Sequence, residues 1–140
     1  MAFNQQMLRK FIPVLTQVET TAADVFTWIP KKSIMVRDVS IVVTELCALD
    51  TTDSIASLDH TDTAHSVSRA EKATFTLTEA DAIGLELIAS VNSGVAWVPF
   101  VVEAGDTLFF EHKQAGADSG TATGAFYFIL YYDAISDGVS

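Results

Sequence analysis

The densest group of ionisable side chains in the sequence is the segment DHTDTAH, which contains Asp59, His60, Asp62 and His65. Carboxylates and imidazoles are common ligands of divalent metal ions. The spacing, however, matches neither a His-Glu-x-x-His zinc motif nor a calcium loop with glycine at its sharp turn. We interpret the segment as part of a solvated polar loop over residues 50–62 and predict no metal and no cofactor. Ion binding by these four residues stays open as the alternative.

The sequence contains no pattern typical of a nucleophilic or phosphate-binding site. It has no Gly-x-Ser-x-Gly motif, and no Lys-Ser/Thr pair follows the glycines of residues 113–124. The single cysteine, Cys47, lies in the apolar run IVVTELCAL, which is typical of a small buried hydrophobe. A carboxylate pair for glycoside chemistry stays open, because any two of eighteen acidic residues can meet in a fold. We predict that the protein is not an enzyme.

Aromatic side chains offer a second kind of chemistry, because flat rings on a β-sandwich can stack against sugar rings. The candidates are Trp28, Trp97, Tyr127, Tyr131 and Tyr132. Trp97 lies in the apolar segment VAWVPF, which also fits a core or interface residue. A carbohydrate-binding module is therefore the alternative to the structural function inferred below.

Charge is distributed unevenly along the chain, whose formal net charge is −10. Residues 1–37 contain five basic and two acidic side chains, whereas residues 38–140 contain three basic and sixteen acidic ones. A body this acidic repels phosphate backbones, so we expect no nucleic-acid binding. The longest apolar runs are far shorter than the roughly 20 residues that span a bilayer, and the start of the sequence lacks the pattern of a secretory signal. We therefore expect no membrane association.

Strand signals dominate the 140 residues, a length typical of one domain. Residues 33–46 are rich in Val and Ile, and their alternation changes phase near Arg37 and Asp38, which predicts a bulge. We expect hairpin-forming strands at 85–91 and 95–102 around Asn92-Ser93-Gly94, and a tight turn at Ala104-Gly105-Asp106 before another strand. The remaining strands are expected at residues 11–19, 25–29, 73–78, 107–112 and 125–132.

These signals predict an all-β fold, an antiparallel jelly-roll-like sandwich of about eight strands. Residues 1–20 are expected to form an N-terminal arm or first strand, with Pro13 marking an edge, and residues 21–140 the sandwich domain. Residues 95–102 and 125–132 are apolar on both strand faces. A two-layer sandwich buries one face of each sheet, so the second apolar face predicts association with other subunits.

Three segments of the sequence resemble the small jelly-roll decoration, cement or head-fibre proteins of tailed bacteriophages. They are IPKKSIMVRDVSIVVTE, VEAGDTL and GAFYFILYYD, and the similarity covers roughly residues 25–134. The closing Gly-Ala-Phe-Tyr-Phe also resembles the trimeric TNF- and C1q-like jelly rolls, although those extracellular proteins fit less well with a chain that shows no signal peptide and no disulfide pattern.

The resemblance implies a virion protein, assembled in the host cytoplasm, that binds the outside of a capsid as a homotrimer. Its expected partners are further copies of itself and the major capsid protein. By this analogy the N-terminal segment docks on the shell through Arg9, Lys10, Phe11 and Ile12. The subunit interface is expected to contain Trp97, Phe126, Phe128 and Tyr131.

Overall fold

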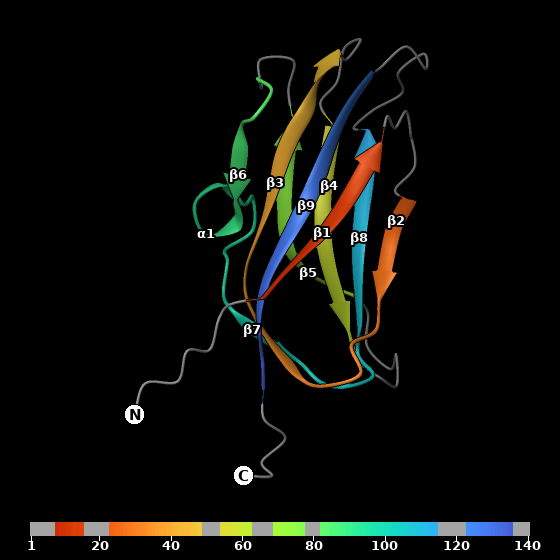
Figure 1. The fold of residues 1–140 in the computed structure, drawn as a ribbon, viewed down its shortest axis with the longest axis vertical. Helices are drawn as coiled ribbons and strands as arrows, with labels where there is room; N and C mark the ends of the chain where they lie inside the picture. The colour runs from red at the N-terminus through yellow and green to blue at the C-terminus, as the bar shows by residue number, and fades with distance from the viewer. Residues whose placement is uncertain are drawn as a thin grey trace.

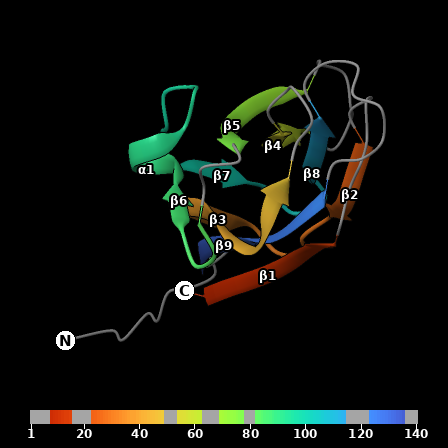
Figure 2. The same ribbon diagram turned by 90° about the horizontal axis from the view of Figure 1, so that it is seen from above.

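The computed structural model describes residues 8–15, 23–48, 54–62, 69–77, 82–114 and 123–135. Two antiparallel β-sheets pack face to face over one apolar core, which confirms the predicted all-β sandwich (Figures 1 and 2). Sheet A has the order β1-β9-β3-β6, with β7 also paired to β3. Its strands are β1 (Leu8–Leu15), β3 (Ile34–Ala48), β6 (Glu86–Ile88), β7 (Phe100–Val102) and β9 (Thr123–Ala134).

Sheet B has the order β2-β8-β4-β5. Its strands are β2 (Ala23–Trp28), β4 (Ser54–Thr61), β5 (Ala70–Leu77) and β8 (Thr107–Gln114). The strands of both sheets pair in a nested order: β1 with β9, β2 with β8, β3 with β6 and β7, and β4 with β5. A long antiparallel hairpin that folds over in this way is a jelly roll.

The bulge predicted in the Val/Ile-rich strand is present in β3. The register between β3 and β9 shifts between Val36 and Asp38. On both sides of this shift the apolar side chains face the core, since Ile34, Val36, Val39, Ile41 and Val43 are all buried. One additional residue at the bulge thus returns the second half of the strand to the core-facing phase.

Two expectations about local structure were wrong. The polar stretch interpreted as a loop contains β4, which lies between β8 and β5 and buries Ala56 and Leu58 completely. Residues 85–102 do not form a hairpin. Instead β6 and β7 both pair with β3, and between them lie the short helix α1 (Ala89–Asn92) and the segment 93–99. Among the described glycines only Gly84 and Gly105 have positive φ, so Gly94 does not form the expected hairpin turn.

The segment after α1 covers the free edge of β5. The backbone N–H of Gly94 donates to the carbonyl oxygen of Thr74 at 2.9 Å, and the Ser93 hydroxyl accepts from the Thr74 N–H at 3.2 Å. Figure 2 shows α1 at the side of the sandwich where β5, of sheet B, and β6, of sheet A, are the edge strands. Covering an edge strand in this way limits its pairing with another chain.

The first described strand belongs to the sandwich and is not a free arm. β1 pairs with β9 over all of its eight residues, from Leu8↔Tyr132 to Leu15↔Ala125. It is an edge strand, as Pro13 predicts. Residues 1–7 lie outside the described part of the chain. Among the described residues, no helix is long and apolar enough to cross a membrane.

Candidate interaction surface

The outer face of sheet A is the side of that sheet that points away from sheet B. Successive side chains of a strand point to opposite faces, so the registers of β1, β9, β3 and β6 define which residues it contains. Three rows cross it: Arg9–Tyr131–Asp38, Phe11–Ile129–Ser40–Ile88, and Pro13–Tyr127–Val42–Glu86. Seven of these eleven residues are apolar or aromatic: Phe11, Pro13, Val42, Ile88, Tyr127, Ile129 and Tyr131.

Side chains on this face pack against one another, and Ile129, in its middle row, is only 7% exposed. Phe11 is 58% exposed and its ring lies 6.0 Å from that of Tyr127. The Arg9 guanidinium lies 5.6 Å from the centroid of the Tyr131 ring, and the Tyr131 hydroxyl donates to Glu86 Oε1 at 3.3 Å. Ser40, in the middle row, is fully buried, and its Oγ has no hydrogen-bond partner among the described residues. The face is therefore a cluster of aromatic and aliphatic groups with charges at its margins.

The outer face of sheet B has a different composition. Arg69 lies over the Phe109 ring, 3.5 Å from its centroid, and forms an ion pair with Glu111. The Ser57 hydroxyl donates to Glu111 Oε2 at 3.3 Å. The same face carries further polar side chains, namely Thr27, Asp59, Thr61, Thr74 and Thr76. The two outer faces therefore differ in polarity, although Ser57, Asp59 and Thr61 on sheet B are themselves buried, at 7%, 7% and 3% exposed.

The four predicted docking residues do not form one surface. Arg9 and Phe11 point outward on sheet A, but Ile12 is 3% exposed and belongs to the core. Lys10 points inward, and its ammonium lies 4.7 Å from the centroid of a Trp28 ring and 5.4 Å from that of Phe26. The prediction that Lys10 and Ile12 dock on a partner is therefore corrected, because alternation along β1 turns both toward the interior.

The predicted subunit-interface residues are divided in the same way. Phe126 and Phe128 are 4% and 0% exposed and pack in the core, so their assignment to an interface is corrected. Trp97 is partly buried against the core, its ring 5.9 Å from that of Phe100, and its indole donates to the carbonyl of Arg37. Tyr131 lies on the outer face of sheet A. Of the four, it is the one whose position fits an interface.

The carbohydrate alternative depended on accessible aromatic rings. Both indoles, however, make contacts within the chain. The Trp28 ring lies edge-on to the Tyr132 ring, with 5.3 Å between their centroids, and the Lys10 ammonium lies over it. The Trp97 ring contacts that of Phe100, and its indole N–H donates to the Arg37 carbonyl. Phe11, Tyr127 and Tyr131 lie together on the outer face of sheet A, whereas Phe109 lies on the outer face of sheet B beneath Arg69. Neither tryptophan therefore forms an open platform.

The histidine and aspartate cluster is only partly within the described residues. Asp59 is buried on β4, whereas His65 lies outside the described residues. His60 Nε2 lies 3.0 Å from Asp106 Oδ2, which also accepts from the backbone N–H of Glu103 at 3.0 Å. This contact joins β4 to the predicted tight turn, where Gly105 has φ 92°. The described residues contain no group of three ligands that could hold a metal ion.

One histidine lies deep in the sandwich. His112 on β8 is 2% exposed, and its ring lies 5.5 Å from that of Phe126. Burial lowers the pKa of His112 from its ordinary value of 6.5 to about 4, because an imidazolium is poorly solvated in an apolar interior. The side chain of Cys47 lies outside the described part of the structure.

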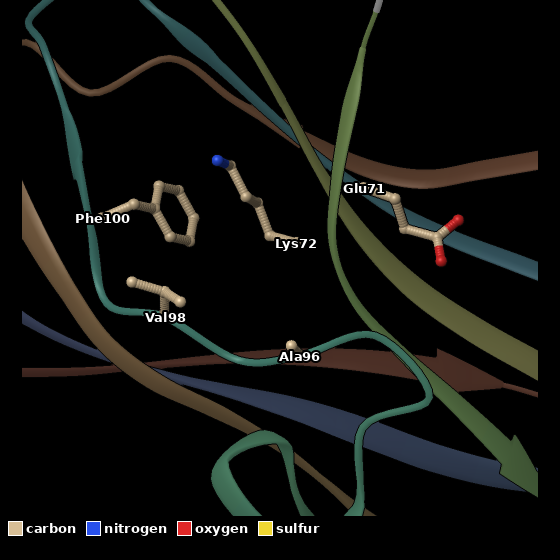
Figure 3. Close-up of a pocket in the computed structure, with 5 residues that line it drawn as sticks. All are labelled: Glu71, Lys72, Ala96, Val98 and Phe100. Carbon is tan, nitrogen blue, oxygen red and sulfur yellow. The ribbon is translucent and has the colours of Figure 1, made fainter.

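A pocket of about 200 Å³ lies beside β5. It is lined by Glu71, Lys72, Ala96, Val98 and Phe100. Figure 3 shows Lys72 extending from β5 toward the Phe100 ring, while the Glu71 carboxylate points away from both. The sequence gives no sign of this pocket, because its walls come from β5 and from residues 96–100, which lead into β7.

No protein-family model matches the chain. No curated protein matches it in sequence. Among solved structures, it is similar to a CocE/NonD family hydrolase from Staphylococcus aureus, with TM-score 0.42 and 10% identity over 91% of this chain and 37% of the hydrolase, so it spans little more than a third of that protein. It is also similar to a structure of Desmodium yellow mottle tymovirus, with TM-score 0.40 and 8% identity over 100% of this chain and 95% of the viral one. At these values neither structure informs the function of this chain.

Proposed function

We propose that this protein is a non-enzymatic structural subunit that works by assembling with other protein subunits through the outer face of sheet A. In its specific form, the proposal is a homotrimeric decoration protein that binds the outside of a viral capsid and reinforces it. The protein would then assemble in the host cytoplasm and reside in the virion. The observation on which this rests is the contrast between the two outer faces of the sandwich.

Burial of apolar area supplies the driving force for this assembly. Phe11 is 58% exposed beside Tyr127 on a face with seven apolar or aromatic residues, and each Å² of apolar surface removed from water contributes about 25 cal/mol. A closed cyclic oligomer can hide the same face on every copy. The outer face of sheet B, where Thr27 and Thr76 are exposed, would then lie outside the interface.

The three sequence segments named above support the specific form of the proposal. Two of them lie in sheet A: the Val/Ile-rich strand is β3 and the aromatic closing strand is β9. A protein that binds only an assembled shell stabilises that shell by mass action, in proportion to the logarithm of its concentration over the dissociation constant. Such a mechanism requires an adhesive surface and no catalytic group.

Light scattering coupled to size-exclusion chromatography at micromolar concentration tests the assembly. We expect a mass of about 45 kDa, three times the 15.1 kDa of one chain. Phe11→Glu places a charge on the outer face of sheet A and should give monomers, whereas the matched control Thr27→Glu on the exposed outer side of β2 should stay trimeric. A monomeric wild-type protein would overturn self-association, and a trimeric Phe11→Glu variant would exclude this face as the interface.

Binding to a shell is tested separately. The wild-type protein should co-sediment with expanded empty heads of tailed bacteriophages and raise the temperature at which they break apart, while Phe11→Glu should do neither. A protein that trimerises but binds no head would retain the general proposal and lose the specific one. Saturable quenching of tryptophan fluorescence by oligosaccharides, from a monomeric protein, would instead support the carbohydrate-binding alternative.

A further inference from the structure

We propose that the pocket beside β5 binds a carboxylate group attached to a short apolar chain. This site shares no residue with the outer face of sheet A and goes beyond the proposed assembly function. The ligand carboxylate would pair with the Lys72 ammonium, and the apolar part would lie against Phe100 and Val98.

The first argument for a carboxylate ligand is the positive charge of Lys72. Arg37 and Arg69 form ion pairs with Asp133 and Glu111, but Lys72 forms no ion pair with any residue in the described ranges. Its Nζ lies 4.9 Å from the centroid of the Phe100 ring, a contact that leaves its N–H donors available to an anion. The chain has a net charge of −10, so acidic side chains are abundant. A lysine that lies in a pocket and has no carboxylate partner among the described residues is therefore a candidate site for an anion.

The walls of the pocket define the rest of the ligand. Ala96, Val98 and Phe100 form its apolar side, and Val98 is 67% exposed. Glu71 also lines the pocket, but its carboxylate is directed away from Lys72 (Figure 3). A cation on one side and aliphatic and aromatic groups on the other match a molecule with one anionic end and one apolar end.

The volume limits the size of the ligand. At about 30 Å³ for each water-sized group, a pocket of about 200 Å³ holds roughly six non-hydrogen atoms. A carboxylate with three attached carbons has this size. A free short-chain carboxylic acid and the acidic side chain of another protein share this chemistry, and the experiment distinguishes these two sources.

The experiment is a titration of the ¹⁵N-labelled full chain with butanoate, followed by NMR. We expect saturable shifts at millimolar concentration in the amides of residues 70–73 and 96–100, weakening as salt is added because salt screens the ion pair. Butanamide and butylammonium have nearly the same shape without the negative charge, and neither should bind. Equal shifts with butanamide, or shifts scattered over the whole surface, would overturn the proposal.

Variants test the assigned residues. Lys72→Met keeps most of the side-chain length and should weaken butanoate binding about tenfold or more, as expected for the loss of a charge-assisted hydrogen bond. Lys31→Met removes one exposed positive charge elsewhere and should leave the affinity unchanged. Phe100→Leu, with circular dichroism to confirm folding, should weaken binding through the apolar wall. Unchanged affinity in Lys72→Met would refute the site.

A second titration identifies the source of the carboxylate. The blocked peptides acetyl-Leu-Glu-Leu-amide and acetyl-Leu-Gln-Leu-amide differ in a single charge. Tighter binding of the glutamate peptide than of butanoate would assign the pocket to an acidic side chain of a protein. Binding of butanoate without the peptide would assign it to a free acid, and binding of neither would contradict the proposal.

Discussion

The indole Nε1 of Trp97 donates a hydrogen bond of 3.2 Å to the carbonyl oxygen of Arg37, at the bulge of β3. The next residue, Asp38, accepts from the Ser90 backbone N–H at 3.3 Å and from the Ser90 hydroxyl at 2.7 Å. A single irregularity in β3 therefore holds α1 at Ser90 and the segment that covers β5 at Trp97.

Replacing Trp97 by Phe should loosen this segment. The variant loses the hydrogen bond to Arg37, which should lower the free energy of unfolding by about 1 kcal/mol. Amide hydrogen exchange should accelerate at residues 93–95, since they depend on the segment remaining against β5. Urea unfolding and exchange measured by NMR check both effects. Val98→Ala, which changes an exposed side chain in the same segment, serves as the control and should show neither.

Gly94 should be replaceable only if Thr74 also becomes smaller. A Cβ at position 94 would lie 2.8 Å from Thr74 Cγ2, so Gly94→Ala should destabilise the protein by about 1–3 kcal/mol, as other overpacked sites do. Thr74→Ser removes that methyl group. In a double-mutant cycle followed by urea unfolding, Gly94→Ala should cost much less in the Thr74→Ser background. Equal costs in the two backgrounds would contradict this steric account.

His112 should make the fold sensitive to acid. Its pKa is about 4 in the folded protein and 6.5 in its ordinary state, so the unfolded chain binds the proton first as the pH falls. The contribution of neutral His112 to the free energy of unfolding is about 3 kcal/mol. It is fully present above pH 6.5 and is lost as the pH falls from 6.5 to 4.

Unfolding free energies measured from pH 7 to pH 4 should therefore decrease more steeply for the wild-type protein than for His112→Gln. Acidic residues titrate in both proteins, so the difference between the two curves isolates the histidine. Parallel curves would show that the protonation of His112 is not linked to unfolding.

Changing Phe128 to Ala should lower the free energy of unfolding much more than changing Phe11 to Ala. Phe128 is fully buried, with its ring 5.2 Å from Phe110 and 5.4 Å from Phe126, so its removal should cost about 3–5 kcal/mol of unfolding free energy. Phe11→Ala should cost less than about 1 kcal/mol in the isolated subunit, because most of its ring is exposed. Chemical denaturation at low protein concentration gives both values, and the reverse order would contradict the placement of the two rings.

The fold could be predicted where periodicity and chain geometry agree. The change of phase near Arg37 predicted the bulge, because five β-branched residues can face one core only if the strand gains a residue there. β4 was missed because its inward residues Ala56 and Leu58 alternate with Ser, Asp and Thr, a composition that loops share. The supposed hairpin failed because the apolar runs on both sides of Asn92-Ser93-Gly94 pair with β3 and not with each other.

The candidate surface could be predicted only in part. Two apolar faces on the closing strand indicated that sheet area would remain exposed, but the sequence alone does not show which face points inward. That choice depends on the register Phe11↔Ile129 and Ile12↔Phe128, which places Phe128 in the core and Phe11 outside. The pocket at Lys72 depends on a contact between distant segments, for which local sequence patterns contain no signal.

The nested order of the strands also has a consequence for how the chain is made. Among the described strands, β1 has β9 as its only neighbour in sheet A, and β3 pairs with β9 along most of its length. Until residues 123–134 have left the ribosome, β1 and β3 lack β9, the strand that lies between them in sheet A. Native structure should therefore form only after residues 123–134 have been made, and slowly, as expected for a topology dominated by contacts between residues far apart in sequence.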